Sequence, residues 1–222
     1  MTEHLSRDLK SIKRHVLKMA SLAEEGLELA REAYTRREEV PVMRLAQVEQ
    51  KIDRLQLEID DEIIKCLALH QPVAGDLRFV TAAMRIVNDL ERIGDLTSSI
   101  SDRLLFIVNN PPLNESVTLD SMMTDTAKML REALNSFVNQ DAVLAREVLA
   151  QDDTIDEANR RHFEVLIERM KRDPDAVEMA IALLSTSRGL ERIADMATNI
   201  AEDVVYMVEA RDIRHPALDH DE

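Results

Sequence analysis

The residues best suited to chemistry in this chain are acids that lie four residues apart in a duplicated motif. The string LERIGD at 90–95 returns as LERIAD at 190–195, and each copy holds one Glu and one Asp at this spacing. The four acids are Glu91, Asp95, Glu191 and Asp195. On a helix, positions i and i+4 share a face and lie about 6 Å apart along the axis. Because such like-charged pairs destabilise an isolated helix by about 0.2–0.5 kcal/mol, their duplication between apolar residues predicts a bound cation.

Further acids occupy matching places in the two halves of the chain. Two more pairs lie near the start of predicted helices, each with Ile directly before the second acid, and one single acid follows each duplicated motif by seven residues. Acid pairs at this spacing are about as common as the composition predicts, so their matching positions, and not their number, select them. The candidate metal-binding residues are Glu49, Asp53, Glu91, Asp95, Asp102, Asp152, Asp156, Glu191, Asp195 and Glu202.

These acids predict a site for hard cations, because carboxylate oxygens are the preferred ligands of magnesium, manganese, calcium and iron. If antiparallel helices bring two pairs to the same height, four carboxylates converge in each half. One alternative is a solvated acidic face, paired with Arg92, Arg192 or Lys51, on a purely structural helical adaptor. The other is a carboxylate-bridged metalloenzyme, although the Glu-x-x-His motif of di-iron bundles is absent from the sequence.

Composition indicates an all-helical chain without a nucleic-acid partner. The 222 residues include only 4 Gly, no Trp and 3% aromatic residues, as is typical of helical proteins. The net charge of −15 at pH 7 disfavours contacts with a phosphate backbone, which need clustered Lys and Arg. The single cysteine, Cys66, allows no internal disulfide and no thiolate metal site. A polar N-terminus and the lack of a long apolar run predict a cytoplasmic protein without a signal peptide or a membrane span.

Apolar residues at helical spacing, separated by turn residues, predict six long helices. The predicted helices are 5–36, 41–69, 76–108, 117–139, 142–172 and 174–210. Asp76, Asp141 and Asp173 are expected to cap the third, fifth and sixth of them. The string NNPPLN at 109–114 is the strongest break and predicts an all-α fold of two tandem antiparallel three-helix bundles. The expected domains are 1–110 and 115–212, followed by a flexible tail at 213–222.

Motifs along nearly the whole chain resemble the PhoU family of phosphate-uptake regulators. They are ERIGD at 91–95, ERIAD at 191–195 followed by MATNIAED, and QPVAGDLR at 71–78. The acid pairs at 49/53 and 152/156 occupy the remaining Glu/Asp-x-x-x-Asp positions of the family. The resemblance implies two similar, spectrin-repeat-like three-helix bundles, each with an acidic metal-binding motif set.

The resemblance also implies a function and partners. PhoU proteins are negative regulators of the phosphate-starvation response and keep it off when phosphate is plentiful. They couple a high-affinity phosphate ABC transporter, through its ATPase subunit, to a membrane sensor histidine kinase. They are not enzymes, commonly form homodimers, and reach the membrane only through these partners. The ions expected from the resemblance and from the ligand chemistry are iron, zinc, manganese or magnesium.

The first repeat departs from the second just after its motif, where LTSSISD replaces MATNIAE. Asp102 is one methylene shorter than Glu202, and Ser99 stands where the second repeat has the amide of Asn199. We therefore expect metal binding to be stronger in the second bundle than in the first.

Overall fold

The structure, a computed structural model, describes residues 3–113 and 119–214, and within these ranges the chain forms helices and no strands. In the first half the helices are α1 (Glu3–Arg36), α2 (Glu39–His70), α3 (Ala74–Ser99) and α4 (Ser101–Asn109). In the second half they are α5 (Leu119–Asn139), α6 (Ala142–Leu149), α7 (Asp152–Arg172), the short 3-10 helix η1 (Pro174–Ala176) and α8 (Val177–Glu209). Among the described residues, none of these helices is both long enough and apolar enough to cross a lipid bilayer.

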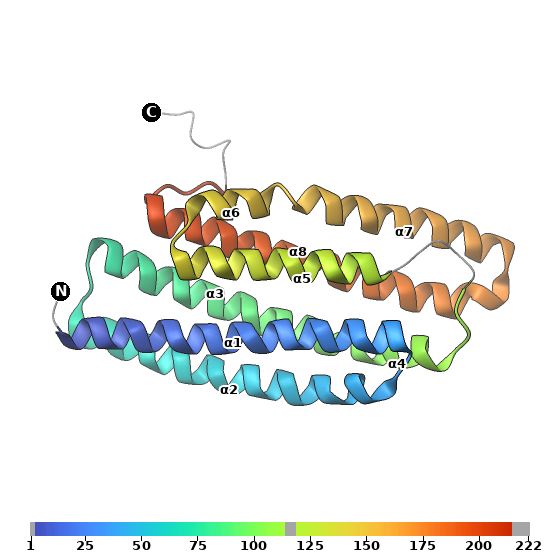
Figure 1. Cartoon of the computed structure of the whole chain (residues 1–222), viewed down its shortest axis with the longest axis horizontal. Helices are drawn as coiled ribbons and strands as arrows, with labels where there is room; N and C mark the ends of the chain where they lie inside the picture. Colours follow the sequence, from blue (N-terminus) through green and yellow to red (C-terminus); the bar gives the residue numbers. More distant parts are fainter. Residues whose placement is uncertain (1–2, 114–118, 215–222) are drawn as a thin grey trace.

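The helices form two tandem antiparallel bundles, which confirms the predicted fold class (Figure 1). In the first bundle α1, α2 and α3 all contact one another, and α4 continues the direction of α3. In the second bundle α8 is the central helix, because α5, α6 and α7 each pack against it. The predicted break at 109–114 begins where α4 ends, but residues 114–118 and 215–222 lie outside the described part of the chain. The domain limits and the tail at 213–222 therefore stay predictions.

Two of the six predicted helices are interrupted, which is a correction to the sequence analysis. The predicted helix 76–108 is divided at Ile100 into α3 and α4, and the predicted helix 142–172 is divided at 150–151 into α6 and α7. Near the first break, the hydroxyl of Ser99 bonds the Leu96 carbonyl, and near the second the side chain of Gln151 bonds the Glu147 carbonyl. The same kind of bond occurs inside unbroken helices, from Thr97 to the Ile93 carbonyl and from Thr186 to the Ala182 carbonyl, so these bonds alone do not account for the breaks. A break of one or two residues barely disturbs the apolar spacing, so the pattern did not reveal it.

The predicted helix caps are confirmed at two positions and wrong at the third. The Asp141 carboxylate accepts hydrogen bonds from the backbone N–H groups of Val143 and Leu144, both at 3.0 Å, and that of Asp173 accepts one from Asp175 at 3.1 Å. Asp76 is not a cap, because α3 begins two residues earlier and Asp76 lies in its first turn. The position before α3 has extended backbone and no side-chain cap.

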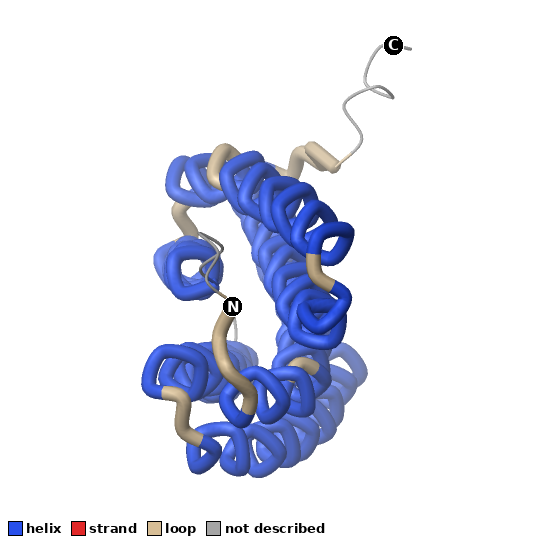
Figure 2. Tube along the Cα trace, turned by 90° about the vertical axis from the view of Figure 1, so that its right-hand side faces the viewer, coloured by secondary structure: helices blue, strands red, loops and turns tan. Residues whose placement is uncertain are grey.

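The two bundles pack side by side into one continuous core. Helix α1 contacts α5, while α3 and α4 contact α8, and the end-on view in Figure 2 shows the helices of both halves around a shared interior. At this seam the rings of Phe79 and Phe137 stack with their centroids 5.7 Å apart.

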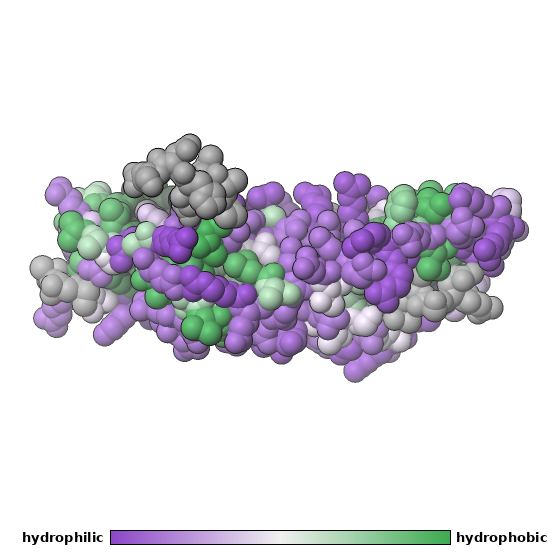
Figure 3. Space-filling model, turned by 90° about the horizontal axis from the view of Figure 1, so that it is seen from above, coloured by the Kyte–Doolittle hydropathy of each residue, from purple (hydrophilic) through white to green (hydrophobic). Residues whose placement is uncertain are grey.

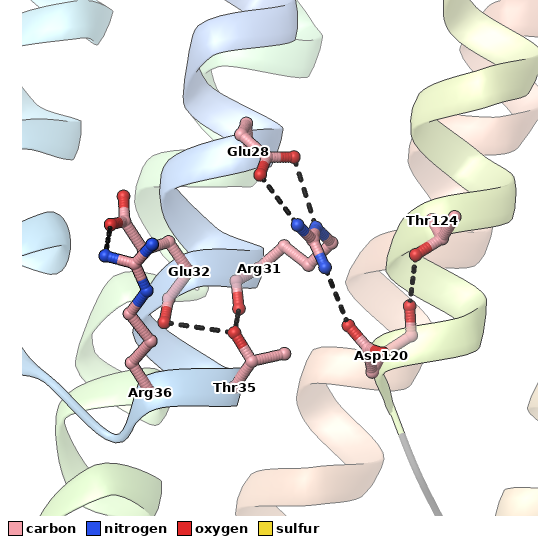
Figure 4. A network of polar contacts seen from close by, with 7 residues as sticks. All are labelled: Glu28, Arg31, Glu32, Thr35, Arg36, Asp120 and Thr124. Atoms are coloured by element: carbon pink, nitrogen blue, oxygen red, sulfur yellow. Dashed lines mark hydrogen bonds and ion pairs between the residues drawn. The ribbon is translucent and has the colours of Figure 1, made fainter.

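A polar network also crosses the seam between α1 and α5 (Figure 4). The Arg31 guanidinium donates two hydrogen bonds to the Glu28 carboxylate and one, at 3.2 Å, to Asp120 of α5. The Asp120 carbonyl in turn accepts a bond from Thr124. The network therefore joins the two bundles near the start of α5.

Candidate metal centre

The second half brings four of the predicted acids together. Asp152 and Asp156 lie at the start of α7, Glu191 and Asp195 lie in the middle of α8, and the two helices pack against each other. Burial raises the pKa of Asp152 to about 6, and repulsion from Asp156, Asp195 and Asp153 adds to the rise. The charges of Asp156 on α7 and Asp195 on α8 therefore both act on Asp152, and a shared metal site at these acids stays a prediction.

The pKa values of the two α8 acids are raised as well, whereas Asp156 is exposed on α7. Burial raises the pKa of Glu191, and the carboxylates of Asp195, Asp156 and Asp152 raise it further against the opposing charge of Arg188. Burial also raises the pKa of Asp195, with Asp156 adding to the rise and Arg192 opposing it. A site in which several carboxylates resist ionisation is one that a bound cation would stabilise. We call Asp152, Asp156, Glu191 and Asp195 the second-half cluster.

One oxygen of the second-half cluster has no hydrogen-bond partner. Oδ1 of Asp152 is buried and bonds to no atom in the described part of the chain. Buried polar atoms are nearly always satisfied in folded proteins, so an orphaned carboxylate oxygen indicates an absent ion, water or proton. Among residues 3–113 and 119–214, no three acidic, histidine or cysteine side chains are arranged to enclose a metal ion. Repulsion among carboxylates favours larger distances between them when no cation screens their charges.

The first half holds a weaker version of the cluster. Burial raises the pKa of Glu91 on α3, and repulsion from Asp95 and from Asp53 of α2 adds to it. Asp53 and Asp95 themselves are exposed. Glu49 is half-buried, and its carboxylate accepts a hydrogen bond of 2.6 Å from the Ser98 hydroxyl. In the first half, then, one predicted ligand already has a protein partner and two face solvent.

The two single acids do not join either cluster. Asp102 is exposed on α4, beyond the helix break at Ile100. Glu202 is half-buried on α8, where its charge acts on Arg214.

A groove opens directly beside the second-half cluster. It has a volume of about 570 Å³ and lies between α7 and α8, with Asp156 and Glu191 in its wall. Arg160, Arg188 and the exposed side chain of Phe163 also line it. An ion would therefore have an open path from solvent to the cluster.

A pair of buried acids at the seam was not among the residues predicted from the sequence. Asp89 of α3 and Asp203 of α8 are only 8% and 4% exposed. The Arg85 guanidinium donates to the Asp203 carboxylate at 2.8 Å, and burial together with the charge of Asp203 raises the pKa of Asp89 to about 6. The sequence does contain an indication that Asp89 is buried, because it lies between Ile86 and Ile93 on the apolar stripe of its helix.

Comparison with known proteins identifies relatives of this chain. Residues 16–104 and 119–204 each match the family model of the PhoU domain. The chain is 34% identical over 211 residues to the phosphate-specific transport system accessory protein PhoU homolog of Aquifex aeolicus (strain VF5), which covers 95% of this chain and 96% of that protein. It is 32% identical over 223 residues to the homolog of the same name from Pseudomonas aeruginosa, over 98% of this chain and 92% of that one.

Two solved structures share the fold. The crystal structure of PhoU from Pseudomonas aeruginosa has a TM-score of 0.89 and 31% sequence identity, over 93% of this chain and 99% of that chain. The crystal structure of the phosphate transport system regulatory protein PhoU from Streptococcus pneumoniae has a TM-score of 0.81 over 94% of this chain and 99% of that chain. At 24% identity the second likeness supports the fold alone.

Proposed function

The chain belongs to the PhoU family, and on that premise we propose that it is a non-enzymatic regulator of phosphate transport. Its relatives are named as accessory proteins of a phosphate-specific transport system. We propose that it acts as a negative regulator of the phosphate-starvation response in the cytoplasm. In this role a homodimer contacts both the ATPase subunit of a phosphate ABC transporter and a sensor histidine kinase.

We also propose that the second-half cluster binds a metal ion such as iron, zinc, manganese or magnesium. The observation that carries this proposal is the buried Oδ1 of Asp152, which lacks a partner beside three further carboxylates. A bound cation supplies positive charge that screens their repulsion. The carboxylates of α7 would then hold α7 and α8 together at their contact. The first half fits an ion less well, because Glu49 is bonded to Ser98 and Asp53 and Asp95 are exposed.

The metal proposal is tested by the double variant Glu191→Ala and Asp195→Ala. We expect the purified variant to lose bound metal, measured by elemental analysis, because half of the second-half cluster is removed. The control is Glu164→Ala and Glu168→Ala on α7, an acid pair at the same spacing whose Glu168 bonds Lys171 on the surface. Unchanged metal content in the first variant would contradict the proposal. Turnover by the metal-loaded protein in hydrolytic or redox assays would favour a metalloenzyme instead.

The regulatory proposal is tested with the purified partners. We expect the full chain to bind the isolated ATPase subunit of the transporter and the cytoplasmic part of the kinase in separate titrations. Regulation requires that the chain prefer one of its partner-bound states over the other. We therefore expect the affinity of the chain for the kinase to differ between titrations with and without the transporter subunit. Light scattering measures the dimer independently. Failure to bind either partner would contradict the coupling function while leaving the metal proposal intact.

A further inference from the structure

A cavity that no part of the proposed function uses lies across the seam between the two bundles. It has a volume of about 490 Å³ and is lined by the first turns of α1 and α3, the end of α8 and the turn after α5. All four segments meet at the end of the molecule where α1 begins (Figure 1). Ligand sites of small molecules have volumes of roughly 300–1,000 Å³ and favour the junctions between domains. We call this cavity the seam pocket.

The wall of the seam pocket is basic, although the chain as a whole is strongly acidic. Lys10, Lys13 and Arg78 line it against a single acid, Asp76, in a protein whose net charge is −15. Three cations and one carboxylate leave a formal charge of +2 in the wall. Concentrated positive charge in a concave site attracts anions.

Two of the three cations are held in place by carbonyl groups of the second bundle. The Lys13 ammonium donates to the Val138 carbonyl at 2.6 Å, and Nε of Arg78 donates to the Met207 carbonyl at 3.2 Å. The other end of the Arg78 guanidinium lies beside the first turn of α3, where a Cβ on Gly75 would be 4.0 Å from Nη2. The cations are thus positioned by residues from both bundles and keep further N–H groups for a ligand.

The third cation has no structural role within the described residues. Lys10 is exposed, and its ammonium group forms no ion pair or hydrogen bond with any residue in 3–113 or 119–214. The cavity floor beside it is apolar and rigid, because Phe79 is buried and stacks on Phe137. Leu9, Met207 and Val208 extend this apolar wall. The seam pocket therefore combines free positive charge with a firm hydrophobic surface.

We propose that the seam pocket binds a small organic phosphate, with its phosphate at Lys10 and Arg78 and its apolar body against Phe79 and Met207. A phosphomonoester carries about −1.5 to −2 charges at pH 7, which matches the +2 of the wall better than a monocarboxylate does. Arg offers paired donors to phosphate oxygens, and Lys offers a point charge. Such a ligand contacts both bundles and stabilises their packing at this end of the molecule.

The proposal is tested by titrating the full-length protein with phenyl phosphate and AMP in a calorimeter. Inorganic phosphate is the control for the phosphate group without an organic part, and adenosine is the control for the organic part without a phosphate. We expect at least one of the two esters to bind more tightly than either fragment. The assignment to an organic phosphate would be overturned if neither ester bound at millimolar concentration. It would also be overturned if inorganic phosphate bound as tightly as the esters.

Site specificity is tested by Lys10→Ala and Lys10→Glu. We expect Lys10→Ala to weaken ester binding about tenfold, as for the loss of one charged hydrogen bond, and Lys10→Glu to weaken it further. Lys18→Ala is the matched control, because Lys18 is exposed on the same helix and does not line the seam pocket. Circular dichroism checks that all three variants fold. Equal affinity in the Lys10 variants and the wild type would overturn the site. Because the pocket shares no residue with the second-half cluster, the result is independent of the metal test.

Discussion

Asp89 and Glu91 show how two neighbouring acids on one helix reach different environments. Two residues along a helix turn its face by about 200°, so the carboxylates point to nearly opposite sides of α3. Asp89 faces the seam and Asp203 of α8, whereas Glu91 faces Asp53 of α2. The duplicated motif drew attention to Glu91, but Asp89 is the more deeply buried of the two.

At the residue scale we predict that Asp89→Asn stabilises the protein at neutral pH. A carboxyl whose pKa rises from 3.8 to about 6 on folding contributes stability below pH 4 that is lost as the pH rises through 6. The amide keeps the shape of the side chain without the charge. We expect a gain of about 1–3 kcal/mol in the free energy of unfolding at pH 7.5, measured with urea.

The same comparison at pH 5 provides the control for Asp89→Asn. Asp89 is largely protonated there in the folded protein, so the gain should shrink. Asp203 remains paired with Arg85 in both proteins, and Arg92 and Asn199 face the site in both. An identical pH dependence of stability in wild type and variant would show that Asp89 does not titrate as proposed.

At the scale of elements, the close approach of α8 to the junction of α3 and α4 depends on a glycine. A Cβ placed on Gly189 would lie 2.7 Å from Cγ2 of Ile100, the residue at the helix break. Real side chains do not approach so closely, and the methyl of a β-branched residue has little freedom to move away. The break at Ile100 and the glycine on α8 are therefore complementary parts of one contact.

We predict that Gly189→Ala destabilises the wild type by about 1–3 kcal/mol through overpacking. In an Ile100→Ala background, where Cγ2 is absent, the same substitution should be stabilising by up to about 1 kcal/mol, because Ala favours the helix. Urea denaturation of the four proteins in this double-mutant cycle measures the coupling. Additive effects of the two substitutions would show that the contact does not limit the packing of α8.

At the scale of the whole molecule, apolar side chains are exposed toward the ends of one face. On the face seen in Figure 3, hydrophobic side chains gather toward the end where α8 finishes and in a second patch at the opposite end, and hydrophilic side chains cover most of the middle. The exposed apolar side chains near the end where α8 finishes include Val143 and Val208. The seam pocket lies at the same end of the molecule, so both features are available to ligands or partners there.

For the whole molecule we predict that metal binding raises the thermal midpoint. A ligand that binds only the folded state at 100 times its dissociation constant adds about 2.7 kcal/mol, which corresponds to roughly 5–10 °C for a protein of this size. Melting curves with manganese or zinc, and with a chelator, measure the shift. The variant Glu191→Ala and Asp195→Ala should show none. An unchanged midpoint in the wild type at millimolar metal would support the purely structural alternative.

The sequence alone determined the all-helical class, the duplication and the acid pairs that share a helix face. These properties depend on local spacing along a helix, which a sequence contains in full. The caps at Asp141 and Asp173 follow from equally local hydrogen bonds. The three-helix plan of each half was also predictable, because long helices with short turns pack antiparallel.

Only the tertiary structure decided which acids meet and which are buried. The height at which α7 lies against α8 couples Asp152 with Asp195, and the helix break at Ile100 separates Asp102 from the first-half acids. The pairing of the two bundles buries Asp89 and Asp203 and closes the seam pocket. These outcomes depend on the register between helices far apart in sequence, and the periodicity of each helix contains no information about that register.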